Sequence, residues 1–276
     1  RRFVPSQTDL IDSMHSSGLP VSRIVTELRQ RTNVIVQNKD VYNALQPCKR
    51  TQVDGLSQVQ ELLSALDGNA EFAYKVSADR NNKLNGLTFA ARRALAQFSF
   101  MNFVLLMDAT YKTNRFNMPF LIISSVDQFG RTYIVACCLM KDETTLAYNL
   151  ALLSFKQLFG PVEPRVEVIV TDQDNALISA ITTQFPNSHH QLCKWHLAMN
   201  IKKHFGENSP ICLKFSRFMN SPNETVAEQI YLVMVEDCSS QEKAYLKRVC
   251  GLREKFVEAW VSRYRNLGIR STQRAE

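Results

Sequence analysis

The amino-acid sequence predicts an α/β fold in which helices flank a mixed β-sheet. Short β-branched and apolar runs bounded by turn-forming residues are typical of buried strands, and they occur at 103–107, 119–126 and 132–140. Further along the chain, helical and strand-like segments alternate, which is typical of parallel strands joined by helices. The other expected elements of the sheet layer are a strand at 72–76 followed by a polar turn at 79–82, a helix at 88–98, a helix at 144–159, a strand at 166–171, a helix at 174–184 and a short strand at 189–193.

Length and composition indicate one large globular domain or two modest ones. The chain has 276 residues with 45% apolar content, which is enough for a sizeable core. No run of 18 uncharged apolar residues occurs, and residues 1–5 have no apolar region like that of a signal peptide. Seven cysteines without framework spacing suit reduced thiols. We therefore expect a soluble, intracellular protein.

The net charge of +7 is unevenly distributed. Residues 1–50, 51–100, 101–190 and 191–276 carry net charges of +4, 0, −2 and +5, respectively. An acidic centre between basic segments suits an enzyme that grips a polyanion while its carboxylates bind metal ions. The alternative is a soluble basic domain, with a pI near 9.1, that never contacts nucleic acid.

Both ends of the chain are expected to be helical. Apolar periodicity predicts three short helices within 7–46 and a fourth at 55–66. The first three form either a helix-turn-helix-like unit or a small helical domain that only packs on its neighbour. The basic residues that favour the first of these interpretations are Arg23, Arg29, Arg31 and Lys39. Residues 195–265 lack strand-like alternation and are predicted to be mostly helical.

Two aspartates follow predicted buried strands. Asp108 ends the apolar run at 104–107, and Asp172 ends the run at 166–171. Acids at the carboxyl ends of buried strands lie where open α/β sheets bind their ligands. Together with Glu276, they would supply the carboxylates that two hard divalent cations need for an in-line phosphoryl displacement. Asp174, two residues after Asp172, is expected to cap the next helix.

The spacing of these acids predicts an insertion. Asp108 and Asp172 are 172 − 108 = 64 residues apart, which leaves room for two strands and a helix. Glu276 lies 276 − 172 = 104 residues further on, too far for a simple loop. An inserted helical subdomain must therefore precede Glu276, which we expect on a helix beginning near Ser271.

Four ordered motifs carry a resemblance to a known family. Residues 108–114, with Met118-Pro119 just after, are similar to the first acidic motif of Mutator-like (MULE) transposases, and residues 171–176 are similar to the second. Cys193 and His196 match the Cys-x-x-His signature of that family, and 272–276 resembles the segment that ends on its third acid. The resemblance is dense from about 85 to 205 and resumes at the end of the chain.

The resemblance implies a ribonuclease-H-like fold with a helical insertion before the third acid. The expected organisation is an N-terminal helical subdomain at 1–68, a catalytic core at 69–196, a helical insertion at 197–265, and at 266–276 the start of the helix that carries the third acid. We expect that helix to continue past Glu276 in a longer protein.

The resemblance also implies a function, the catalytic core of a DNA transposase. Asp108, Asp172 and Glu276 would bind two Mg²⁺ or Mn²⁺ ions, which activate water and then the new 3′-hydroxyl, without a covalent protein–DNA intermediate. The implied partners are the double-stranded DNA of transposon ends and target and further copies of the chain, in the nucleus and away from membranes. The other interpretation is a catalytically silent, DNA-binding regulator, because the far-red-impaired-response relatives in plants are domesticated transcription factors.

Two further groups of residues remain open to more than one interpretation. Cys193 and His196 form either half of a zinc site or a packed, hydrogen-bonded pair, since only one ligand pair is visible and a structural site needs four ligands. Basic side chains could contact DNA phosphates, or could belong to a turn and a solvated helical surface. These candidate DNA-binding residues are Lys112, Lys202, Lys203, Lys247 and Arg248.

Overall fold

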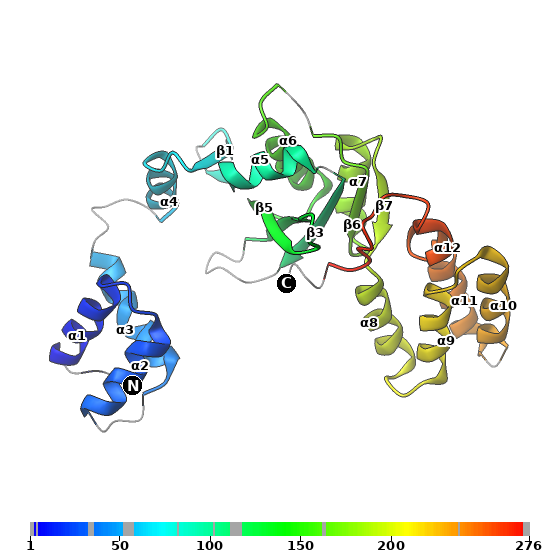
Figure 1. The fold of residues 1–276 in the computed structure, drawn as a ribbon, viewed down its shortest axis with the longest axis horizontal. Helices are drawn as coiled ribbons and strands as arrows, with labels where there is room; N and C mark the ends of the chain where they lie inside the picture. The colour runs from blue at the N-terminus through cyan, green and yellow to red at the C-terminus, as the bar shows by residue number, and fades with distance from the viewer. Residues whose placement is uncertain are drawn as a thin grey trace. The chain divides into compact units, whose positions relative to one another are not determined.

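The computed structural model describes residues 3, 5–32, 36–51, 58–81, 83–101, 103–110, 118–161, 164–236 and 238–272. The chain divides into two compact units, residues 1–69 and 70–276, and each is described by itself. Figure 1 shows their helices and strands. None of the helices in these ranges combines the length and the apolar character needed to cross a membrane.

The first unit is helical, and its three predicted helices within 7–46 are confirmed. Its elements are α1 (Pro5–Ser16), α2 (Val21–Thr32), α3 (Asn38–Thr51) and α4 (Gln58–Asp67). The first three share a core that contains Ile11, Ile24 and Val41. Two of the basic residues considered for DNA binding have partners within the unit: Arg29 donates to the backbone carbonyl of Val36 at 2.6 and 2.8 Å, and Arg31 pairs with Glu27.

The second unit contains a mixed sheet with flanking helices, which confirms the predicted α/β class. Its strands are β1 (Phe72–Ala78), β2 (Leu84–Ala91), β3 (Val104–Thr110), β4 (Phe120–Val126), β5 (Thr132–Met140), β6 (Val168–Thr171) and β7 (His189–Leu192). In the described residues they form one seven-stranded sheet in the order β1-β2-β5-β4-β3-β6-β7. β3, β6 and β7 are mutually parallel, and the other neighbours are antiparallel.

The two faces of the sheet belong to different cores because alternate side chains of a strand point to opposite faces. Leu105 and Met107 of β3 pack with residues of α5 (Arg92–Phe100), α6 (Thr145–Gln157) and α7 (Asn175–Gln184). Leu106 packs in a second cluster with Cys193, which lies between β7 and the helix that follows it, and with Ile269, which is near the end of the described chain. β3 is therefore buried on both faces.

The region after β7 is helical, as predicted. Its elements are α8 (Lys194–Phe205), α9 (Pro210–Met219), α10 (Glu224–Val235), α11 (Ser240–Cys250), the 3₁₀ helix η1 (Arg253–Lys255) and α12 (Glu258–Val261). They have a core of their own, in which Phe215, Phe218 and Phe256 are fully buried and in mutual contact. In Figure 1 these helices extend from the β7 end of the sheet.

The structure corrects one predicted element. The helix predicted at 88–98 is wrong in its first turn, since residues to Ala91 form β2 and α5 begins at Arg92. The turn before β2 is closed by Asp79, whose carboxylate accepts the backbone N–H groups of Asn81 and Lys83. β2 then pairs with β1 on one side and β5 on the other. Pairing on both sides outweighs local propensity, which is a weak guide for strands.

Candidate active site

Asp108 and Asp172 lie at the same edge of the sheet, on neighbouring parallel strands. β3 and β6 pair in register, with Leu106 opposite Val170 and Met107 opposite Thr171. Met107 and Thr171 are each followed by an aspartate, and neighbouring strands lie about 4.8 Å apart. The two carboxylates therefore form an adjacent acid pair at the edge where open α/β sheets bind their ligands. β3 continues past Asp108 to Thr110, so Asp108 lies within its strand and not after it.

The acid pair faces one side of the sheet. Side chains two residues apart in a strand share a face, so Asp108 lies on the face of Leu106. Asp172 directly follows β6, and its charge, like that of Asp108, acts on His196. Leu106 and Val170 belong to the cluster that contains Cys193 and Ile269. The acids therefore face the side on which the last described segment of the chain packs.

Both acids have less contact with solvent than carboxylates usually have. Asp108 is only 6% exposed. Oδ1 of Asp172 is buried and accepts no hydrogen bond from the described residues. Burial raises the pKa of Asp172, the nearby His196 acts in the opposite direction, and the charge of Asp174 raises it further. A buried carboxylate oxygen without a donor is costly unless a cation or another donor satisfies it.

Asp174 has the structural role expected from the sequence. It is the N-cap residue of α7, and its carboxylate accepts the backbone N–H of Leu177 at 2.7 Å. The predicted helix cap is therefore confirmed.

A further acid, Glu143, was missed by the sequence analysis. It lies between β5 and α6, and burial, together with the charges of Asp174 and Asp172, raises its pKa. The hydroxyl of the buried Tyr148 is its hydrogen-bond partner. The missed signal is topological: β5 is antiparallel to β4, which is antiparallel to β3, so β5 ends at the same edge as Asp108.

The Cys-x-x-His pair links the acids to the end of the described chain. Sγ of the buried Cys193 accepts the backbone N–H of Thr272 at 3.3 Å and lies 3.5 Å from the Thr272 hydroxyl. Burial opposes ionisation of the thiol, but hydrogen bonds from His196 and Thr272 outweigh it and lower its pKa to about 6. The bond to Cys193, and then the charges of Cys193, Asp108 and Asp172, raise the pKa of His196 against the effect of burial. His196 is thus coupled to the thiol and to both acids.

Metal ligands are only partly visible in the described ranges. No group of three or more His, Cys, Asp or Glu side chains is gathered there in a way that could hold a metal ion. Cys193 and His196 bond to each other, which is the packed, hydrogen-bonded arrangement. Glu276 lies outside the described residues. Ser271 and Thr272, where its helix was expected to begin, are not helical.

The predicted DNA-binding residues that the structure describes separate into two groups, one outside and one lining a groove. Lys112 lies outside the described residues. Lys202 pairs with Glu207 at 3.8 Å, and Lys247 is exposed on α11. Lys203 and Arg248, by contrast, line one groove, together with Gln173, the residue after Asp172.

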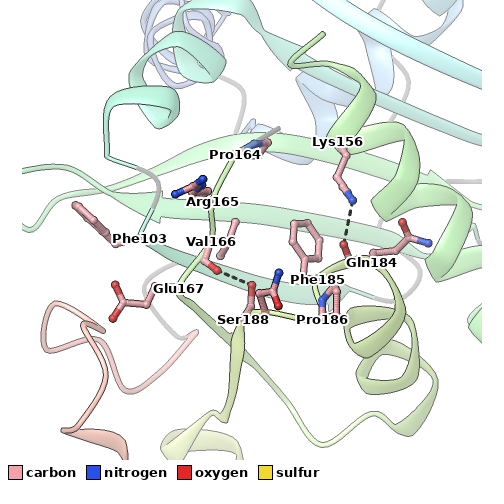
Figure 2. Close-up of a pocket in the computed structure, with 11 residues that line it drawn as sticks. Phe103, Lys156, Pro164, Arg165, Val166, Glu167, Gln184, Phe185, Pro186 and Ser188 are labelled. Carbon is pink, nitrogen blue, oxygen red and sulfur yellow. Dashed lines mark hydrogen bonds between the residues drawn. The ribbon is translucent and has the colours of Figure 1, made fainter. Parts of the chain in front are cut away.

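A larger pocket lies away from the acids. Figure 2 shows this cavity of about 820 Å³, lined among others by Phe103, Val166 and Phe185. Phe103 and Val166 precede β3 and β6, whose carboxyl ends carry the acid pair. The pocket is therefore at the opposite edge of the sheet, where Lys156 donates to the backbone carbonyl of Gln184 at 3.1 Å.

Comparison with known proteins gives this geometry a family context. Residues 104–200, from the start of β3 into α8, match the family model of the MULE transposase domain. The predicted resemblance is confirmed. The MULE transposase domain match includes Asp108, Asp172, Cys193 and His196 but not the groove residues Lys203 and Arg248.

Three plant proteins are among the relatives to which this chain is similar. Putative protein FAR1-RELATED SEQUENCE 10 of Arabidopsis thaliana is 25% identical over 75% of this chain and 32% of its own length. Protein FAR1-RELATED SEQUENCE 5 is 23% identical over 93% of this chain and 34% of its own. Protein FAR-RED IMPAIRED RESPONSE 1 is 23% identical over 96% of this chain and 34% of its own. The chain spans about a third of the length of these relatives.

Proposed function

We propose that this chain is the catalytic core of a DNA transposase and cleaves DNA through a metal-dependent Asp-Asp-Glu triad. The observation that carries the proposal is the adjacent pair of Asp108, which is buried, and Asp172, whose Oδ1 is buried, toward the ends of neighbouring parallel strands. We further propose that the sheet is ribonuclease-H-like. Support comes from the antiparallel run β3-β4-β5 followed by two parallel strands on the other side of β3.

The metal site would consist of Asp108, Asp172 and Glu276. Carboxylate oxygens are the ligands that Mg²⁺ and Mn²⁺ prefer, and the buried Oδ1 of Asp172 has no hydrogen-bond donor among the described residues. The residues therefore fit a divalent cation. Two such ions would supply an activated water or 3′-hydroxyl and stabilise charge on the leaving oxygen.

The protein's own side chains would hold and neutralise the substrate. The pKa of His196 is raised by Cys193 and by the charges of Asp108 and Asp172, so its imidazole is protonated more readily than an ordinary histidine and, once protonated, would offset a phosphate's negative charge. Cys193 would hold the segment at Thr272, four residues before Glu276, beside the sheet. No side-chain nucleophile takes part in this mechanism.

The proposed partners follow from that chemistry and from the family. The substrate is double-stranded DNA, at transposon ends and at the target. Two or more copies of the chain would act together on DNA, since two transposon ends must be processed, and the site of action would be the nucleus.

A second candidate function is a catalytically silent, DNA-binding regulator. It is favoured by the relatives, since one matched plant protein is named for a far-red response and another for its relation to FAR1, and neither is named for transposition. On this proposal the fold and DNA contacts are retained and strand cleavage is lost.

Nicking of supercoiled plasmid by the full-length protein in Mg²⁺ tests these proposals. The wild type is expected to nick DNA, and Asp108→Asn, Asp172→Asn and Glu276→Gln are expected to abolish nicking, because each loses a charged oxygen ligand and keeps its shape. Asp174→Asn is the matched control, since asparagine also caps helices. If Asp172→Asn cleaves DNA and Asp174→Asn does not, the metal ligand is Asp174 and not Asp172. DNA binding without nicking by the wild type would favour the silent regulator.

A further inference from the structure

A groove between two helices begins beside the acid pair. It has a volume of about 400 Å³, and its lining comes from the loop after β6, from α8 and from α11. We call it the α8–α11 groove and define it by Gln173, Asn200, Lys203, His204, Tyr245 and Arg248. Gln173 directly follows Asp172, so one end of the groove is at the candidate active site.

The helical spacing of α8 continues the site into this groove. His196, Asn200 and Lys203 are spaced i, i+4 and i+7, which puts them on one face of the helix. His196 is coupled to Asp108 and Asp172, whereas Asn200 and Lys203 line the groove. A single stripe of side chains therefore leads from the acid pair along α8.

The groove is basic and has ordered walls. No acidic residue lines it, and neither Lys203 nor Arg248 forms an ion pair with a carboxylate in the part of the chain that the structure describes. The Tyr245 ring stacks on His204 at 3.8 Å and 9°, and the Arg248 guanidinium lies 5.3 Å from its centroid. Packing on the Tyr245 ring restricts the Arg248 guanidinium, so its donors lose less freedom on binding an anion.

We propose that the α8–α11 groove binds the DNA phosphate backbone next to the scissile bond, through Lys203 and Arg248. The position is estimated from the helix, because seven residues at about 1.5 Å each separate His196 from Lys203 by roughly 10 Å. We place α8 along the duplex axis, where a DNA strand rises about 3.4 Å per nucleotide, so the bound phosphates would be roughly three nucleotides from the cleaved bond. This inference rests on the proposed function for its position, but not for the phosphate contact itself.

Two double variants of the full-length protein test the contact. Lys203→Ala/Arg248→Ala removes both groove cations, and Lys202→Ala/Lys247→Ala removes the same charge from the neighbouring positions outside the groove. For the groove variant we expect roughly tenfold weaker DNA binding and a log–log salt slope flattened by about 1.8, because each lost phosphate contact removes about 0.9. The matched variant is expected to change both quantities much less. Equal effects of the two variants would overturn the proposal.

Neutral methylphosphonates test the position. Substituting one phosphate at a time, we expect the wild type to lose affinity roughly three nucleotides from the cleaved bond and the groove variant to be insensitive there. Equal sensitivity of both proteins at every phosphate would refute the groove. If the groove variant loses binding but no form of the protein cleaves DNA, the phosphate site stands and the nuclease function fails. If the groove variant cleaves DNA and binds it with wild-type affinity, the nuclease function stands and the phosphate site fails.

Discussion

The backbone N–H of Thr272 donates a hydrogen bond to Sγ of Cys193 across 79 residues of sequence. A second hydrogen bond joins the same two segments, because the N–H of Lys194 donates to the carbonyl of Arg270 at 2.9 Å. The segment that leads toward Glu276 is thus fastened to the start of α8, beside the acid pair. In the Cys-x-x-His signature, the cysteine accepts hydrogen bonds from the returning chain, and the histidine donates to the thiol.

Replacing Cys193 with alanine is expected to loosen that anchor. A buried N–H without an acceptor costs about 1–3 kcal/mol, so Cys193→Ala should lower the free energy of unfolding by that amount and accelerate hydrogen exchange at the Thr272 amide. Cys250→Ala is the control, because Cys250 is also buried but lies in α11, away from Thr272. Wild-type exchange at Thr272 in Cys193→Ala would show that the thiol does not hold the segment.

The elements that the sequence predicted well are those with local signals. β3 and β6 contain short buried runs, and the acids that follow these runs, Asp108 and Asp172, could be recognised directly from the sequence. β2 could not be recognised as a strand, because what stabilises its residues is pairing with β1 and β5 rather than their own periodicity.

The parts of the site that could not be predicted from the sequence depend on the topology of the fold. Glu143 joins the acids only because β5 and β3 end at the same edge of the sheet. Lys202 and Lys203 are adjacent and identical in chemistry, yet only Lys203 lines the α8–α11 groove. That distinction depends on where α11 packs, which sequence spacing does not reveal.

The capping role of Asp174 predicts a difference between two substitutions. Asp174→Ala removes the acceptor for the Leu177 N–H and should destabilise the protein by about 1 kcal/mol, whereas Asp174→Asn keeps a capping side chain and should be nearly neutral. Chemical denaturation of the two variants measures the difference. Equal losses of stability would mean that the charge of Asp174, rather than its cap, is what matters.

Glu258 predicts a pH dependence of stability. Hydrogen bonds from Arg270, and then from Lys194, outweigh burial and lower its pKa from 4.5 to about 2. Because the folded state favours the carboxylate, this contribution is fully present above pH 4.5 and is lost as the pH falls toward 2. Glu258→Gln should therefore be less stable than the wild type at pH 7 and show a shallower loss of stability across that window.

The control for Glu258 is another ion pair of the helical region. Glu224 pairs with Arg263, but both side chains are more than half exposed, so Glu224→Gln should leave the acid dependence close to that of the wild type. Thermal unfolding at a series of pH values measures both variants. Parallel curves for Glu258→Gln and the wild type between pH 4.5 and 2 would contradict the assignment.

Cation binding by the acid pair predicts a shift in thermal stability that is independent of cleavage. A cation that binds only the folded state stabilises it by about 2.7 kcal/mol at a hundred times its Kd, so Mg²⁺ or Mn²⁺ should raise the Tm of the wild-type protein after EDTA treatment. Asp108→Asn and Asp172→Asn should lose this rise, since each removes a charged oxygen ligand. Asp174→Asn should keep it, because Asp174 is committed to the cap of α7. If Mg²⁺ or Mn²⁺ raises the Tm of Asp172→Asn as much as that of the wild type, the cation does not bind at the buried Oδ1 of Asp172. Asp108 and Asp172 would then not form a metal site.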